Sequence, residues 1–588
     1  MSDQRAGQAV PKGTWERQNL DGYRVAHAVV DVLANAGVRE IFGQSCPTAI
    51  CMAADQKGIR QIGYRTENAG AAMADGAARI SGRISVILAQ NGPAAALLVA
   101  GLAEALKASI PILAIVQEVP RTTADKNAFQ ELDHEKLFAG CTKWIRRINL
   151  AERAGEYTAR AIQVATSGRP GPVVLLVSPD VLTQEVPGIA PLNHSADTPF
   201  GSYPADRFVP TATGIEEAAN LLVNARQPLV IVGGGVHHSG AANEVARLQM
   251  VAGVPVATTN MGKGVIDESQ PLSIGVVGNS LGTRAPAKFH REYIQGADVI
   301  LFVGTRTNEN GTSGWSLFPA AATYIQIDID PEELGRNYPA LRLLGDARES
   351  LAALNAAIEK LPATGLAART KQIEQVIAQA RAKHTQEAAT PPDTTPGMLH
   401  PETVVRALAA IRDDVTWVAD ASYASIWLVQ YLPSLRAGTR FLTPRGIAGL
   451  GWGFPMAIGA KLATPDKRVI CLTGDGGFAH CWAELETARR HGIPVTVIVL
   501  NNGVLGFQIN AEESRFGSHT DVCHFGPIDH VAIAKACGCD GIQVHNLDEL
   551  TQALDAASRT TLPYVIDVKT DSAAFPPITA FESQRRGS

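Results

Sequence analysis

The sequence predicts an α/β protein made of three domains, each with a doubly wound parallel sheet. Three segments of the chain alternate short apolar runs with helical patterns, an arrangement typical of parallel strands whose connecting helices cover both faces of a sheet. A chain of 588 residues is also too long for one hydrophobic core. Proline-rich stretches lie between the segments, where linkers are expected.

The three segments follow one another along the chain. The first closes with the apolar strand in GRPGPVVLLVSPDV, and the second contains PLVIVGGGVHHSG, DVILFVGTRTNENG and ATYIQIDIDPEELG. In each of these stretches an apolar run ends at a turn, as a buried strand does. The predicted boundaries are a flexible tail over 1–19, domains over 20–190, 208–361 and 400–570, a linker over 362–399 and a tail over 571–588.

Composition and charge argue against several classes of protein. Hydrophobic residues make up 46% and charged residues 19%, as in ordinary globular proteins. A net charge of -5 over this length gives no support for a nucleic acid or an anionic membrane as partner. The most apolar segment is interrupted by Glu104, Lys107 and Pro111, so we expect a buried helix and a strand there rather than a membrane span. The N-terminal residues lack the apolar core of a signal peptide, and we expect a cytoplasmic protein.

A carboxylate stands between glycines directly after a buried strand in RVICLTGDGGFAH. The carboxyl ends of parallel strands are where open α/β sheets bind ligands, and Gly474 permits a tight turn there. The free N–H groups of Gly476, Gly477 and Phe478 favour a phosphate, and Asp475 favours a hard cation. A diphosphate held through a divalent metal would satisfy both. The alternative is a surface turn with a solvated aspartate.

The next strand supplies further oxygen ligands at the same edge of the sheet. In VTVIVLNNGVLGF, Asn501 and Asn502 follow an apolar run as Asp475 follows its own. Gly-Asp-Gly, then 24 residues, then Asn-Asn resembles the signature of thiamine diphosphate enzymes. The resemblance implies that Asp475, Asn502 and the carbonyl of Val504 bind Mg²⁺ on the diphosphate of the cofactor.

Further motifs extend this resemblance over nearly the whole chain, to the branch that contains acetolactate synthase and pyruvate oxidase. They are YRTENAGAAMADGAARISGR, GRPGPV and IDIDPEELG. The resemblance implies pyrimidine-binding, central nucleotide-fold-like and diphosphate-binding domains, in that order. It also implies at least a homodimer, with a homotetramer expected, because family members place the cofactor between the first domain of one subunit and the third of another.

Glu67 matches the family's catalytic glutamate, which hydrogen-bonds a ring nitrogen of the cofactor's aminopyrimidine. The alternative reading is an acid that the helix dipole favours at a helix N-terminus. The alanine- and glycine-rich sequence after Glu67 allows close packing around this carboxyl group.

A loop and a strand end in the third domain should hold the rest of the cofactor. Leu450, in GIAGLGWGFPMAIGA, matches the bulky residue that the family wedges between the two cofactor rings. The carbonyl of Ala448 and the amide of Leu450 would then bond the pyrimidine edge. In VADASYAS, Ser422, Tyr423 and Ser425 would meet the diphosphate, although serine after a strand often caps a helix.

The substrate pocket is predicted to be lined by neutral hydrogen-bonding groups. The first domain has no His-His pair, which argues against the simple pyruvate decarboxylase type. Acetolactate synthases carry an arginine and a tryptophan where this chain has Asn310 and Ala511, so a second carboxylate should bind poorly. The residues expected around the reacting carbon are the catalytic Gln117 and Gln130 together with Gln44, Ser45, Cys46, Asn91, Phe129 and Trp452.

We therefore expect a thiamine diphosphate- and Mg²⁺-dependent lyase or carboligase that acts on a 2-oxo acid or 2-hydroxy ketone. The resemblance implies a C2 carbanion and an enamine as intermediates. A 2-oxo acid decarboxylase, a 2-hydroxyacyl-CoA lyase, a flavin oxidoreductase and a non-catalytic subunit remain as alternatives. The glycines of IVGGGVHHSG and Arg306 keep FAD or ADP open as a ligand of the central domain. We expect His237 and His238 on a surface loop.

Overall fold

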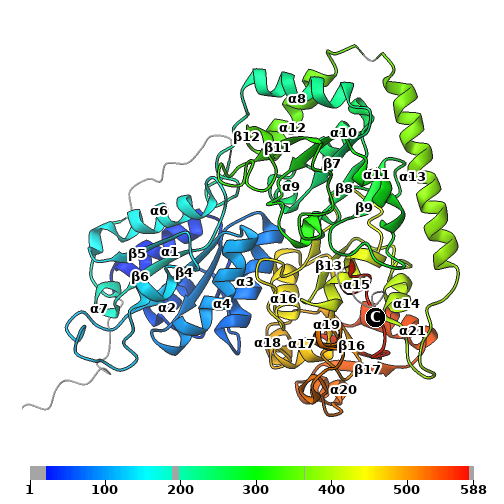
Figure 1. The fold of residues 1–588 in the computed structure, drawn as a ribbon. Helices are drawn as coiled ribbons and strands as arrows, with labels where there is room; N and C mark the ends of the chain where they lie inside the picture. Colours follow the sequence, from blue (N-terminus) through cyan, green and yellow to red (C-terminus); the bar gives the residue numbers. More distant parts are fainter. Residues whose placement is uncertain (1–20, 189–197, 363, 580, 582–588) are drawn as a thin grey trace, which may run out of the picture.

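The computed structural model describes residues 21–188, 198–362, 364–579 and 581. In this part of the chain the strands form three six-stranded sheets, and the strand pairs within each sheet are parallel. The predicted fold class is thereby confirmed. Figure 1 shows the first sheet in blue and cyan, the second in green and the third in yellow to red.

The first sheet is a parallel sheet with helices on both faces. In spatial order its strands are β2 (Arg60–Ile62), β1 (Glu40–Phe42), β3 (Ser85–Ala89), β4 (Ile112–Gln117), β6 (Val173–Val177) and β5 (Trp144–Ile148). Strands β3 and β6 are buried along their whole length, as expected for continuous apolar runs. The helices are α1 (Val25–Asn35), α2 (Thr48–Gln56), α3 (Glu67–Ser81), α4 (Pro93–Ala108), α5 (His134–Phe138), α6 (Ala154–Thr166) and α7 (Pro179–Leu182).

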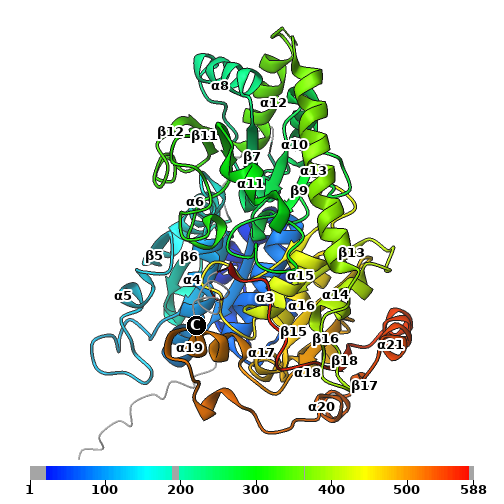
Figure 2. The ribbon, with the colours of Figure 1, turned by 45° about the vertical axis from the view of Figure 1, so that its right-hand side comes forward.

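The second sheet forms the core of the central domain. In spatial order its strands are β12 (Ala340–Leu344), β11 (Thr323–Asp328), β10 (Val299–Val303), β7 (Pro228–Val232), β8 (Val256–Thr258) and β9 (Ser273–Val276). Its helices are α8 (Ala212–Asn224), α9 (Gly234–Ser239), α10 (Ala242–Ala252), α11 (Arg291–Gln295), α12 (Ala347–Ile358) and α13 (Leu366–Ala388). The predicted linker is largely α13, which runs along the outside of the molecule in Figures 1 and 2 and buries Ile373, Ile377 and Ala380 on one face.

The third sheet carries the predicted metal motif. In spatial order its strands are β14 (Phe441–Leu442), β13 (Val415–Ala419), β15 (Arg468–Gly474), β16 (Thr496–Asn501), β18 (Tyr564–Lys569) and β17 (Asp540–Val544). Its helices are α14 (Pro401–Leu408), α15 (Tyr423–Tyr431), α16 (Gly453–Ala463), α17 (Asp475–Ala479), α18 (Glu484–Arg490), α19 (Gly506–Phe516), α20 (His530–Ala536) and α21 (Leu547–Arg559). Within the described residues, no helix is both long and apolar enough to cross a bilayer.

Helices α3 and α16 join the first and third domains by a direct backbone contact, and Figures 1 and 2 both show them side by side. A Cβ atom added at Gly459 would lie 1.8 Å from the carbonyl oxygen of Met73, and one added at Gly76 would lie 2.1 Å from that of Met456. Only glycine permits so close an approach. The relative position of the two domains is therefore fixed by these glycines.

The segment after β18 packs across the molecule onto the central domain. The N–H of Gly282 donates to the carbonyl of Pro577 at 3.0 Å, and the N–H of Thr579 donates to that of Asn279 at 2.9 Å. This segment therefore holds the third domain against the central one. The tail was predicted over 571–588, but residues 571–579 belong to this packed segment. Residues 580 and 582–588, like the tail predicted over 1–19, lie outside the described residues.

Replacing Gly459 by Ala should destabilise the protein. The added methyl group has no room beside the carbonyl of Met73, and overpacking of this kind costs about 1–3 kcal/mol. In a helix, alanine is otherwise more favourable than glycine by about 1 kcal/mol, so helix propensity alone would raise the melting temperature. A lower melting temperature would therefore be due to the clash. Gly140→Ala is the matched control, since a Cβ atom there meets nothing within 4 Å. Equal melting temperatures for the two variants would contradict the expected clash.

Candidate functional site

Three neighbouring strands of the third sheet end at one edge, where a cavity opens. Strands β13, β15 and β16 are adjacent, and the register pairs Gly474 with Leu500, so the residues that follow lie together. The cavity has a volume of about 920 Å³. Its lining includes most of the predicted cofactor residues, namely Ser422, Tyr423, Ala448, Leu450, Gly474, Asp475, Gly476, Gly477, Asn502 and Val504.

Asp475 and Asn502 supply the oxygen atoms that a cation would need. Asp475 is 7% exposed, and its Oδ2 accepts the N–H of Gly503 at 2.8 Å. Burial raises the pKa of Asp475, and the N–H groups of Gly503 and Gly476 oppose that shift. The Oδ1 of Asn502 accepts the N–H of Val504 at 3.2 Å, and Asn502 lines the same cavity as Asp475.

The donor set at this edge fits Mg²⁺. No three His, Cys, Asp or Glu side chains gather into a metal site in the described parts of the chain, so one carboxylate and neutral oxygens must suffice. That composition suits Mg²⁺, which binds through one or two carboxylates and takes its remaining ligands from water and substrate phosphates. Asp475, Asn502 and the carbonyl of Val504 are therefore the residues that would hold it.

The loop that carries Leu450 is anchored by a buried acid that the sequence reading did not single out. Asp420, 1% exposed, follows β13 and accepts three backbone N–H groups through its carboxylate, at 2.9, 3.0 and 2.9 Å. The donors are Gly451, Trp452 and Gly453. A Cβ atom at Gly477 would lie 2.1 Å from Asp420 Oδ2, so this glycine is required by close packing. The only signal in the sequence was an acid directly after an apolar strand.

Two of the predicted site residues, Ser425 and Trp452, have side chains that do not face the cavity, and the same holds for Phe478, whose backbone N–H was the predicted contact. Ser425 is fully buried, and its hydroxyl donates to the carbonyl of Ser422 at 2.8 Å and accepts from Arg445. The ring of Phe478 packs edge-on against Phe454, with the centroids 5.9 Å apart. Trp452 is 4% exposed and lies behind the loop rather than on the cavity. The sequence placed these residues near the site, but their side chains point into the core.

The first domain presents its predicted residues at the edge formed by β1, β3 and β4, which are neighbours in the sheet. Gln44 follows β1 and donates to the carbonyls of Tyr64 and Arg65 at 3.1 and 3.0 Å. Asn91 follows β3 and donates to the carbonyls of Phe129 and Gln130 at 3.2 and 3.1 Å. Gln117 is the last residue of β4.

Ser45, Cys46 and Phe129 complete this edge of the first domain. Ser45 has a left-handed φ of 63°. Burial raises the pKa of the Cys46 thiol to about 11, so a thiolate is disfavoured near neutral pH. The side chain of Phe129 is 84% exposed.

Glu67 lies apart from the cavity that holds Asp475. It starts α3 behind the N-cap Thr66 and is 8% exposed. The N–H groups of Arg65 and Thr66 donate to Glu484 of the same chain at 3.0 and 3.2 Å. Among the described residues, the lining of the 920 Å³ cavity includes nothing from the first domain. Glu67 and Asp475 of one chain therefore do not line the same cavity.

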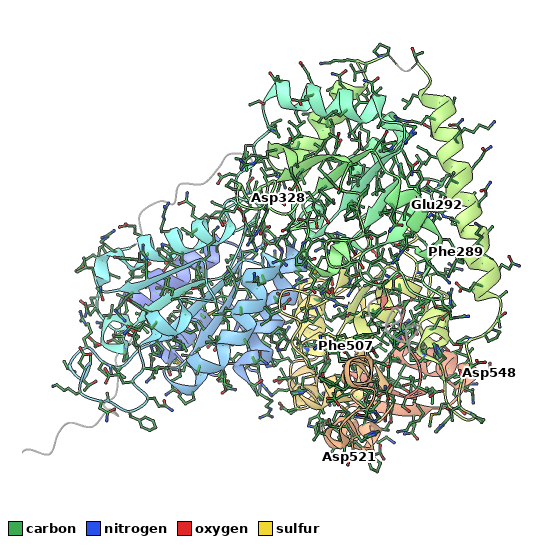
Figure 3. All side chains as sticks on the ribbon, viewed as in Figure 1. Phe289, Glu292, Asp328, Phe507, Asp521 and Asp548 are labelled. Carbon is green, nitrogen blue, oxygen red and sulfur yellow. The ribbon has the colours of Figure 1, made fainter. Side chains whose placement is uncertain are left out.

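A second, smaller cavity of about 140 Å³ lies where the central domain meets the other two. It is lined by Arg169, Arg306 and Asp328 among others, and Figure 3 labels Asp328 on the side of the central domain that faces the first. Burial raises the pKa of Asp328 to about 7. Burial lowers the pKa of Arg306, helped by Arg169 nearby.

The prediction for His237 and His238 was wrong. Both belong to α9 and are half-buried. A ring nitrogen of His237 lies 2.9 Å from the carbonyl oxygen of Lys263, and burial lowers the pKa of His237 to about 3. The helix packs against the rest of the central domain, so these side chains are only partly exposed to solvent.

Three models of one enzyme family match the chain in order. They are the N-terminal TPP binding domain of thiamine pyrophosphate enzymes over residues 23–137, the central domain over 215–354 and the C-terminal TPP binding domain over 420–568. Each match falls within one of the three sheet domains.

Known proteins align with the chain over most of its length. A probable acetolactate synthase large subunit of Methanocaldococcus jannaschii is 32% identical over 566 residues, which cover 94% of this chain and 93% of that protein. The acetolactate synthase large subunit of Parasynechococcus marenigrum is 31% identical over 92% of this chain and 87% of its own. The acetolactate synthase of Arthrospira platensis is 30% identical, with coverage of 96% and 97%.

Proposed function

This chain belongs to the thiamine pyrophosphate enzymes, in the acetolactate synthase-like branch, and from that premise we propose that it makes or breaks the bond beside the carbonyl of a 2-oxo acid or 2-hydroxy ketone. The proposal includes Mg²⁺ as the link to the diphosphate. The observation that carries it is one cavity lined by Asp475, Asn502, Val504 and Leu450. Asp475, Asn502 and Val504 would supply a carboxylate, an amide and a carbonyl oxygen to the metal. Leu450 would supply the apolar side chain that packs against the cofactor rings.

Thiamine diphosphate, when bound, supplies a carbon nucleophile and an electron sink. The protein has to bind it, orient it and assist one proton transfer. Asp475 and Asn502 would hold the metal, and the backbone around Gly476 and Gly477 would bind the diphosphate. Leu450 would pack between the two rings of the cofactor. Glu67, which is 8% exposed, would hydrogen-bond the pyrimidine ring and assist that proton transfer.

The acceptor that this cavity suits is not a second 2-oxo acid. Arg445 is the one Lys or Arg side chain that lines the cavity within the described residues, and it is already bonded to Ser425. Glu309, Asn310 and Asp571 also line it, so within the described residues the lining offers a second carboxylate no cationic side chain besides Arg445. A carboxylate needs a charged partner to bind strongly. We propose a neutral acceptor, or a proton, for the second half of the reaction, as in a decarboxylase or a 2-hydroxyacyl-CoA lyase.

The active unit we propose is at least a homodimer, and a tetramer would repeat the same contact. Glu67 and Asp475 of one chain do not line the same cavity, and the edge of the first domain exposes apolar side chains. Met52, Leu97 and Phe129 are 52, 51 and 84% exposed. A twofold dimer would bring each edge of the first domain onto the third domain of the other copy.

No flavin step enters this proposal. The central cavity, about 140 Å³, is well below the roughly 300–1,000 Å³ of sites for molecules of drug size. Its arginines would suit a phosphate group, so FAD or ADP remains a proposal for the central domain that requires the cavity to widen.

Calorimetry followed by product analysis tests the proposed function. We expect binding of thiamine diphosphate that requires Mg²⁺, and then release of CO₂ or an aldehyde from members of a panel of 2-oxo acids and 2-hydroxy ketones. Ligated products should form with aldehydes more readily than with a second 2-oxo acid. Absence of binding with Mg²⁺ present would contradict the function, and efficient formation of acetolactate would contradict the choice of acceptor.

A further inference from the structure

A carboxylate of the first domain holds the loop that presents Leu450 in the third. Glu104, on α4, accepts the N–H of Gly446 at 2.6 Å through Oε1. Its Oε2 accepts the N–H of Ile447 at 2.6 Å and that of Ala448 at 3.2 Å. Three successive backbone donors thus converge on one side chain that lies more than three hundred residues away in the sequence.

The Glu104 side chain is well suited to this role. The residue is 2% exposed, so its carboxylate has little access to water and depends on these N–H groups as partners. Hydrogen bonds to a carboxylate are stronger than those between neutral groups. A buried acceptor that loses its donors carries the full cost of its desolvation. The backbone of Ile447, a residue that is 48% exposed, is therefore tied to a carboxylate in the interior.

A buried ion network neutralises Glu104 and ties it to the same part of the third domain. Arg79 Nη2 lies 3.7 Å from Glu104 Oε1, and Arg79 Nε lies 2.6 Å from Asp75 Oδ1. Arg79 also donates to the carbonyl of Thr443 at 3.0 Å, and Arg440 donates to the carbonyl of Arg79 at 2.6 Å. Contacts therefore run in both directions between α3 and the strand-loop segment 440–448.

The Leu450 loop, residues 446–453, is hydrogen-bonded at one end to the first domain and at the other end to the third. Glu104 holds residues 446–448, and Asp420 holds residues 451–453. Between them stand only Gly449 and Leu450. Ala448 has a left-handed φ of 62°, a backbone conformation that costs energy for a residue with a Cβ atom and persists only where its surroundings enforce it.

We propose that Glu104 is a positioning residue for the cofactor site: its carboxylate fixes the backbone of residues 446–448, and hence the Ala448 carbonyl and Leu450, from the first domain of the same chain. This inference rests on the proposed function for the purpose of the loop, but the hydrogen bonds themselves are a property of the chain without any ligand. The position of the first domain then affects the cofactor site in two ways. Within a chain it sets the Leu450 loop, and across the dimer it supplies Glu67.

The hydrogen bonds from residues 446–448 to Glu104, which we call the clamp, can be tested by comparing amide hydrogen exchange in the ligand-free wild-type protein and in Glu104→Gln. A glutamine keeps the size of the side chain, but it loses the charge and turns an N–H₂ group toward backbone donors. We expect amide exchange in peptides that cover 444–450 to accelerate about 10- to 100-fold, while peptides of β15 and β16 exchange as before. The dissociation constant for thiamine diphosphate with Mg²⁺, measured by calorimetry, should rise by a similar factor.

Two further variants separate the clamp from a general loss of structure. Glu152→Gln removes an exposed glutamate of the same domain and should change neither measurement. Glu104→Asp keeps the charge with a shorter reach and should restore part of the protection and part of the affinity. Unchanged exchange over 444–450 in Glu104→Gln, or acceleration spread equally over β15 and β16, would overturn the clamp. If the loop loosens but the wild-type protein binds no thiamine diphosphate, the proposed function fails and the clamp stands.

Discussion

Replacing Asp475 by Asn should remove Mg²⁺-dependent binding of thiamine diphosphate and, with it, turnover. Asp475 is the one carboxylate in the proposed donor set, so its loss leaves the cation with neutral ligands only. Changes to residues that merely support metal ligands already cost 10- to 100-fold in affinity or activity. We therefore expect the dissociation constant to rise by more than about 100-fold, measured by calorimetry in the presence of Mg²⁺.

Removing the metal should reproduce this effect in the wild-type protein. Chelation with EDTA should abolish the binding heat, and added Mg²⁺ should restore it, whereas Asp475→Asn should gain little from added Mg²⁺. Asp548→Asn is the matched control, because Asp548 is an exposed acid in the same domain (Figure 3). Cofactor binding by Asp475→Asn with wild-type affinity would remove the aspartate from the metal site.

Replacing Glu67 by Gln should lower turnover about 10²- to 10⁴-fold, the usual loss when acid-base assistance is removed. The amide keeps the size and hydrogen-bonding geometry of the side chain but cannot share a proton with the pyrimidine nitrogen. Cofactor binding should change much less than turnover, since the metal ligands are intact. Steady-state kinetics and calorimetry on the same preparation check both halves of this expectation, and an unchanged turnover would exclude Glu67 from the mechanism.

Mixing the two inactive variants tests whether the site is shared between chains. In a mixed dimer of Glu67→Gln and Asp475→Asn, one site receives both changes and the other neither. Coexpression in equal amounts should therefore restore about a quarter of the wild-type activity. If Glu67 and Asp475 of one chain formed the same site, every site in the mixture would carry one change, and no activity would return.

Residues whose role depends on backbone and chain order were predictable from the sequence. Gly474, Asp475 and Asn502 follow strands whose ends must meet at one edge of a parallel sheet, and the structure brings them to one cavity. The parallel sheets themselves follow from apolar runs that alternate with helices. The linker was also predicted to begin as a helical, charged stretch, and the structure has α13 there.

Residues whose role depends on side-chain direction were not predictable. Ser425 and Trp452 lie in the right segments, but the Ser425 hydroxyl is bonded to Arg445 and the Trp452 ring packs against Gly449. Asp420 and Glu104 were missed as site residues for a related reason. Each is a buried acid whose partners are backbone N–H groups of a loop far along the chain, and nothing in the neighbouring sequence indicates that contact.

Because α3 and α16 pack so closely at their glycines, the N-terminal part of this protein should not be stable as a separate fragment. Each domain has a complete sheet, which would suggest three modules that can be produced singly. A fragment that ends near residue 400, however, would leave the alanine- and glycine-rich face of α3 in water, without the helix that it was shaped to receive. Such a truncated piece should self-associate or be degraded. Studies of the isolated N-terminal part therefore need α16, or a soluble substitute for its surface, supplied in the same polypeptide.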